Sequence, residues 1–227
     1  MHPVYGALLG CVTGALAWLT ARAFIAHHRD ETVDLAWLRR QLGAARDARG
    51  AVTPLGATFV AALAILGAYL GWRATGAAQV VAALIASGLY AAITVVDFRV
   101  RRIPNPLVVA LLVWGGVQML WLGRPTLPAA GLGLLVGGGI FLLLALLRRG
   151  AMGAGDVKLA AAIGWLVGYP LVLTALFWGI VAGGVAAVVL LVTRRAGRKD
   201  TMAYGPYLAL GGWVLQLAML GLLPWGT

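Results

Sequence analysis

Two aspartates are the residues of this sequence best placed to do chemistry. Of the seven acidic residues, only Asp97 and Asp156 lie against or within the long apolar stretches. An ionisable group near bilayer hydrocarbon costs on the order of a few kcal/mol, so a carboxylate kept there is by default a functional candidate. Two carboxylates brought close cannot both ionise cheaply, and the pair then shares one proton. That state suits general acid and base catalysis of hydrolysis.

Asp97 comes at the end of an apolar run and is followed closely by arginines. A carboxylate at the C-terminal end of a helix opposes the helix dipole, so local helix stability does not explain this residue. The following arginines, Arg99, Arg101 and Arg102, could instead partner it in a plain salt bridge. From this segment alone, the salt bridge and catalysis explain Asp97 equally well.

Asp156 follows a glycine-rich segment and begins the next apolar stretch. Aspartate is a favoured helix N-cap, so this segment alone divides evenly between capping and catalysis. The preceding Gly153 and Gly155 have no side chain to obstruct an extended peptide that approaches the backbone. Lys158 and Arg99 could lower the pKa of the aspartates, but we interpret both chiefly as markers of the membrane interface.

The composition requires that membrane helices position these residues. The 227 residues are 62% hydrophobic and only 11% charged, which is too apolar for a soluble domain. A helix needs roughly 20 residues to cross a bilayer. The run 159–193 is long enough for two passes, broken at Gly168-Tyr169-Pro170. Together with the other uncharged runs, it predicts an all-α, polytopic transmembrane bundle of about eight helices. Those other runs are 1–21, 54–72, 74–96, 103–123, 125–147 and 201–227.

Glycines recur at the spacing that lets membrane helices approach closely. We expect them to support a compact bundle. The pairs and triplets are Gly6/Gly10/Gly14, Gly133/Gly137, Gly164/Gly168 and Gly179/Gly183.

The positive charges predict the orientation. The formal net charge is +11, and 16 of the 18 lysines and arginines fall in four clusters between alternate helices. Such clusters are typical of cytoplasmic loops, which explains the charge without nucleic acid. Both termini then lie outside the cytoplasm, and Asp97 and Asp156 share the cytoplasmic face.

Three segments follow from this pattern. Residues 1–26 are expected to form a retained first transmembrane helix rather than a signal peptide, because no cationic residue precedes the apolar stretch. Residues 27–53 form a short cytoplasmic connector, and residues 54–227 form the membrane core. Cys11 is the single cysteine and no HExxH occurs, so neither an intramolecular disulfide nor a metal site is expected.

Three segments in order resemble the motifs of bacterial type IV prepilin peptidases, which are membrane aspartyl proteases of the GxGD kind. They are residues 97–105, residues 153–159 and residues 204–212. The resemblance implies that Asp97 and Asp156 are the catalytic pair and that residues 54–227 are the peptidase core. It implies cleavage after a glycine, at the cytoplasmic face of the bacterial inner membrane, with prepilins or pseudopilins as substrates and partners. It also implies active-site loop or substrate-binding roles for Gly153, Gly155, Lys158, Pro104 and Asn105.

The sequence departs from the larger members of that family. Those members carry a cysteine-bearing, zinc-binding cytoplasmic insertion and methylate the new N-terminus with S-adenosylmethionine. Residues 27–53 contain no cysteine, so we expect neither that zinc site nor any cofactor, and methylation is in doubt.

Two other classes remain as alternatives. A proton-coupled transporter could use the aspartates as a relay, and a membrane scaffold would leave the pair unexplained. The sequence leaves the oligomeric state open.

Overall fold

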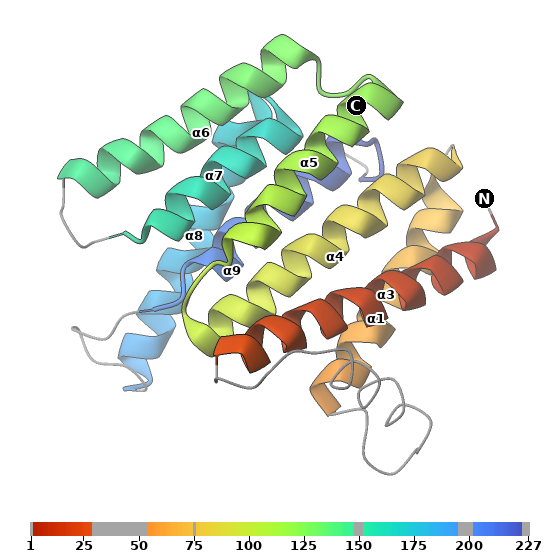
Figure 1. The fold of residues 1–227 in the computed structure, drawn as a ribbon, viewed down its shortest axis with the longest axis horizontal. Coiled ribbons are helices and arrows are strands. Elements are labelled where there is room, and N and C mark those ends of the chain that lie inside the picture. Colours follow the sequence, from red (N-terminus) through yellow and green to blue (C-terminus); the bar gives the residue numbers. More distant parts are fainter. Residues whose placement is uncertain (1, 29–53, 75, 148–151, 195–201, 224–227) are drawn as a thin grey trace. The chain divides into compact units, whose positions relative to one another are not determined.

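The computed structural model describes residues 2–28, 54–74, 76–147, 152–194 and 202–223. Within these ranges the chain forms eight α-helices and no β-strand, which confirms the all-α prediction (Figure 1). Most of the predicted connector, residues 27–53, lies outside the described ranges. The helices are α1 (Pro3–His28), α3 (Pro54–Arg73), α4 (Ala77–Val100), α5 (Asn105–Leu122), α6 (Leu127–Leu147), α7 (Ala154–Val167), α8 (Leu171–Val192) and α9 (Gly205–Met219).

The chain divides into two compact units, residues 1–88 and residues 89–227, and the boundary falls within α4. In the first unit α1 and α3 pack against each other in antiparallel directions. A Cβ on Gly6 would meet the carbonyl oxygen of Gly67, whereas a Cβ on Gly14, further along α1, would lie 3.0 Å from the Cα of Val60. Small residues therefore allow the close approach of these helices that the glycine spacing predicts.

The second unit is built around the short helix α7, which lies between α5 and α6 and also packs against α8 and α9 (Figure 1). Half of its 14 residues are buried. On one side, the Trp165 indole N–H donates to the Leu112 carbonyl oxygen of α5 at 3.0 Å, across Gly115. On the other side, Gly164 meets the backbone of Gly133 in α6. Backbone-to-backbone contact of this kind requires glycine at both positions.

Five of the described helices are long and apolar enough to cross a membrane, namely α1, α4, α5, α6 and α8. The chain is thus a multi-pass membrane protein. By contrast, α7 has 14 residues and at 1.5 Å per residue measures roughly 21 Å, less than the hydrocarbon core of about 30 Å. The run 159–193 divides as predicted, because Gly168 takes a left-handed φ of 75° and ends α7 before α8 begins at Leu171.

Candidate active site

Asp97 lies in the last turn of α4 and is almost fully buried, with 4% of its surface exposed. The helix ends at Val100, and Arg101 turns the chain with a left-handed φ of 54°. The backbone N–H of Gly205, the first residue of α9, donates to Asp97 Oδ2 at 3.1 Å. A buried carboxylate needs such a donor, because burial removes the water that would otherwise bind it.

Asp156 lies in the first turn of α7 and is half-buried. The helix is capped by Gly153, whose N–H donates to Asp156 Oδ2 at 3.2 Å. The capping interpretation of Asp156 is therefore correct in part, although the residue caps from the third helical position rather than from the N-cap. The Asp156 carboxylate accepts this hydrogen bond from the cap and can still take part in catalysis.

Ile103 connects the two helix ends that carry the glycines of the site. A Cβ on Gly155 would lie 3.1 Å from Ile103 Cβ, and a Cβ on Gly205 would lie 3.0 Å from Ile103 Cδ1. Both contacts are tight, so the isoleucine side chain packs against the first turn of α7 and the first turn of α9. The link between α4 and α5 thus fixes the spacing between the turn that carries Asp156 and the turn whose N–H binds Asp97.

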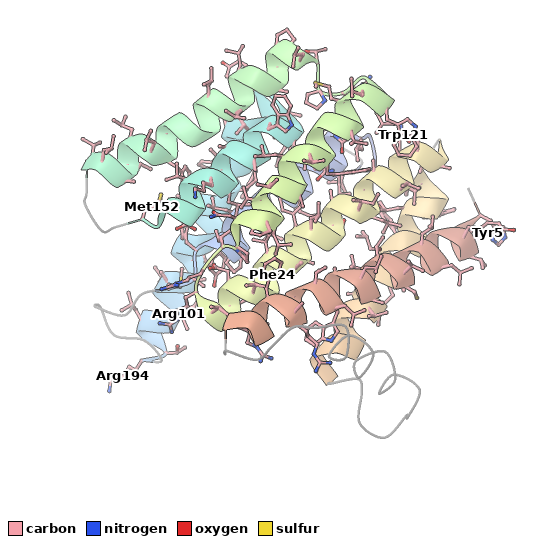
Figure 2. All side chains as sticks on the ribbon, viewed as in Figure 1. Tyr5, Phe24, Arg101, Trp121, Met152 and Arg194 are labelled. Atoms are coloured by element: carbon pink, nitrogen blue, oxygen red, sulfur yellow. The ribbon has the colours of Figure 1, made fainter. Side chains whose placement is uncertain are left out.

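The two aspartates line one pocket of about 270 Å³. Its walls come from the C-terminal end of α4, the link to α5 and the N-terminal end of α7. In Figure 2, Arg101 and Met152, which flank the aspartates in the sequence, lie toward the same end of the second unit. The lining residues are Asp97, Arg101, Arg102, Ile103, Gly153, Ala154, Gly155 and Asp156.

The environment of Asp156 favours its neutral form. Burial, and then the charge of Asp97, raise the pKa of Asp156 to about 6, and the hydrogen bond from Gly153 opposes the rise. The pKa of the Tyr204 phenol is also raised, by burial and then by the charge of Asp156. The charge of Asp97 thus acts on Asp156 within the pocket that the two residues share.

The remaining predicted site residues lie beside the pocket rather than in its lining. Lys158 Nζ donates to Asn105 Oδ1 at 3.0 Å, and this exposed bond joins the start of α7 to the start of α5. Pro104 is the N-cap of α5 and has an extended backbone, with φ of −67° and ψ of 127°. The bond between Lys158 and Asn105 thus links the two helix starts.

Sequence reasoning missed the parts that Ile103 and Gly205 play in this site. Neither carries a titratable side chain: Ile103 acts by packing, and Gly205 acts through its backbone N–H. Gly205 lies within the third segment, residues 204–212, whose resemblance to prepilin peptidases is the one signal that pointed to it. In the described ranges, His, Cys, Asp and Glu side chains nowhere gather in a group of three or more that could hold a metal ion.

Comparisons with known proteins show the family of this chain. The type IV leader peptidase family matches residues 84–188, a segment that contains both aspartates. The type 4 prepilin-like proteins leader peptide-processing enzyme of Escherichia coli O78:H11 is 34% identical over 194 residues, which cover 81% of this chain and 68% of that protein. This chain belongs to the type IV leader peptidase family.

Other members of the family are longer than this chain. A prepilin leader peptidase/N-methyltransferase of Aeromonas salmonicida is 28% identical over 80% of this chain, and the match covers 63% of that protein. The enzyme of the same name from Aeromonas hydrophila is 30% identical over 60% of this chain, and the match covers 49% of that protein. The chain thus spans about half to two thirds of these two relatives. No solved structure matches it.

Proposed function

We propose that this leader peptidase family member is a membrane aspartyl endopeptidase that removes the leader peptide from type IV prepilins or pseudopilins. The observation that carries the proposal is the shared pocket, in which Asp97 and Asp156 face one space from the ends of two helices. The family match supports the substrate class, because the relatives are named for prepilin leader processing. In this proposal residues 54–227 form the peptidase core of a bacterial inner-membrane protein.

The chemistry needs one proton on the pair. The ionised carboxylate takes a proton from a water molecule as the water oxygen bonds to the scissile carbonyl carbon. The protonated carboxylate gives its proton to the carbonyl oxygen, as in other aspartic proteases. When the tetrahedral intermediate collapses, the C–N bond breaks and the leaving nitrogen takes the proton that the base acquired. The carbonyl re-forms as its oxygen returns its proton to the pair, which then again holds one proton.

The substrate reaches the pair as an extended segment. The glycines Gly153 and Gly155 form one wall of the pocket, and Gly153 is exposed. A wall without side chains lets the peptide backbone come close to Asp156. The transmembrane part of a prepilin would lie in the bilayer, so its cleavage site would enter the pocket at the cytoplasmic membrane surface.

The position of the carboxylates argues against the transporter alternative. A proton relay needs ionisable groups along a path through the membrane. Asp97 lies in the last turn of its helix and Asp156 in the first turn of its helix. Both are thus at helix ends, where a soluble leader segment can reach them.

The test is cleavage by the purified full chain in lipid nanodiscs, with a prepilin that carries a class III leader. Mass spectrometry of the product should show loss of the leader at its glycine junction. With S-adenosylmethionine added, we expect no further methyl mass, because residues 27–53 lack the cysteines of the methylating relatives. An uncleaved prepilin, under conditions in which a longer relative cleaves it, would refute the proposal.

A further inference from the structure

The backbone N–H of Gly205 is a group to which neither the sequence motifs nor the comparisons give a role. It starts α9, and it reaches a carboxylate 108 positions earlier in the chain. Its bond to Asp97 Oδ2 is buried, whereas the bond from Gly153 to Asp156 Oδ2 is exposed. A hydrogen bond to a charged group counts for more where water cannot compete for the acceptor.

A side chain at position 205 would disturb the Asp97 carboxylate. A Cβ at residue 205 would lie 2.7 Å from Asp97 Oδ2 and 3.2 Å from its Cγ. Any side chain would therefore push the carboxylate out of its place or lengthen the hydrogen bond. Gly205 thus donates its N–H to the Asp97 carboxylate, and because it has no side chain it leaves room for that carboxylate.

We propose that Gly205 is a positioning residue that assigns the two roles of the pair: its N–H holds Asp97 as the ionised, water-activating member and leaves the proton on Asp156. This inference rests on the proposed peptidase function. The N-terminal end of a helix carries partial positive charge, and α9 begins at Gly205, so the bond and the dipole of α9 favour an ionised Asp97. They act against the burial of Asp97 and against the dipole of α4, which ends beside it.

Charged and titratable groups face Asp97 from several elements. Arg101 and Arg102 line the same pocket and favour a negative charge there. Asp156 faces Asp97 from α7, and Tyr204 precedes Gly205 at the start of α9. The Tyr204 ring packs on Gly183 of α8, where a Cβ would lie 2.6 Å from its Cε2, so the packing of α8 fixes the turn that presents the Gly205 N–H.

An amide-to-ester replacement tests the inference without adding an atom to the site. Glycolic acid at position 205 removes the N–H and keeps the rest of the residue. The control is the matching ester at Tyr207, whose N–H donates to the Tyr204 carbonyl oxygen in the same helical turn. The probe is the prepilin of the cleavage assay, with kcat and KM measured as a function of pH.

We expect the ester at 205 to lower kcat by roughly 10- to 100-fold, the effect of one lost hydrogen bond to a charged group. KM should stay unchanged, and the acidic limb of the pH profile should move to higher pH because ionised Asp97 has lost its donor. The ester at 207 should keep the wild-type profile. Equal profiles for the two esters would overturn the inference.

A second measurement separates this inference from the proposed function. The ¹³C-carboxyl signal of Asp97 can be titrated in the same preparations without any substrate. In the ester at 205 it should titrate at a higher pH than in the ester at 207, whether or not the protein cleaves prepilin. A wild-type chain that does not cleave would refute the function alone, whereas identical titrations would refute the role of Gly205.

A side-chain variant gives the same answer by another route. Gly205→Ala should reproduce the loss of kcat because its Cβ would lie 2.7 Å from Asp97 Oδ2 and displace the carboxylate. Gly184→Ala is the matched control, since a Cβ at 184 would meet no heavy atom within 4 Å. Wild-type cleavage by Gly205→Ala would contradict the inference.

Discussion

Asp156 is the residue at which pH should act on the proposed reaction. Its pKa is raised to about 6 by burial and by the charge of Asp97, so it carries a proton below that pH and loses it above. If Asp156 is the acid of the pair, cleavage should be fastest below about pH 6 and fall up to tenfold for each further pH unit. Initial rates of leader removal from about pH 5 to about pH 8 check this prediction.

A cleavage rate that rises with pH would reverse the assignment of the two aspartates. A rate that rises through about pH 6 and stays high would make Asp156 the ionised base, and the roles given to the two aspartates would be reversed. The prepilin itself should be shown to stay folded and soluble across the same range.

At the residue scale, the sequence identifies the acids but not the groups that hold them. Asp97 and Asp156 could be found because a carboxylate beside apolar segments is costly and therefore informative. Gly205 and Ile103 could not be found in this way, because a backbone N–H and an aliphatic contact have no signature in composition or charge. Their partners lie far away along the chain and meet them only in the fold.

The helices show a similar division between what could and could not be predicted. The eight helices follow from hydropathy, and the break near Gly168 follows from Gly168-Tyr169-Pro170, whose glycine takes a positive φ. Hydropathy cannot distinguish a helix that faces lipid from one that is surrounded by protein. For that reason the sequence predicted eight crossings, whereas α7 and α9, with 14 and 15 residues, are shorter than the five helices suited to span.

The contact between α6 and α7 carries a prediction at the element scale. A Cβ on Gly133 would meet the carbonyl oxygen of Gly164, so Gly133→Val should force the helices apart and destabilise the fold by about 1–3 kcal/mol. Gly131→Val is the control. Gly131 lies in the same helix, and a Cβ added there would meet no heavy atom within 4 Å. Thermal unfolding in detergent measures both variants.

Equal unfolding temperatures for the two variants would contradict the packing of α6 on α7. A loss of stability in both would instead reflect the cost of valine within this helix, and the difference between the variants isolates the contact.

For the whole molecule, the charge distribution predicts how the chain lies in the membrane. Sixteen of the 18 cationic residues fall in loops that we assign to the cytoplasm, and Arg73 and Arg124 are the exceptions. Arg102 and Arg124 are exposed and lie just beyond opposite ends of α5. In a Cys11→Ser background, Arg102→Cys should react with an impermeant thiol reagent only from the cytoplasm, and Arg124→Cys only from outside.

Reaction of both cysteines from the same side would contradict the orientation, because α5 is long enough to span the membrane. It would also remove the reason for placing the pocket at the cytoplasmic surface, where the leader of a prepilin would be accessible. The Cys11→Ser chain without other cysteines shows the background of the labelling.

The central claim is that Asp97 and Asp156 act together as one catalytic pair, and cleavage by single variants tests it most directly. Asp97→Asn and Asp156→Asn keep the size of each side chain but remove its proton exchange, so each should abolish leader removal while the protein remains inserted and folded. Asp34→Asn, the same change in the connector, should cleave like the wild type. Substantial leader removal by either Asp97→Asn or Asp156→Asn in the mass-spectrometric assay would contradict the account.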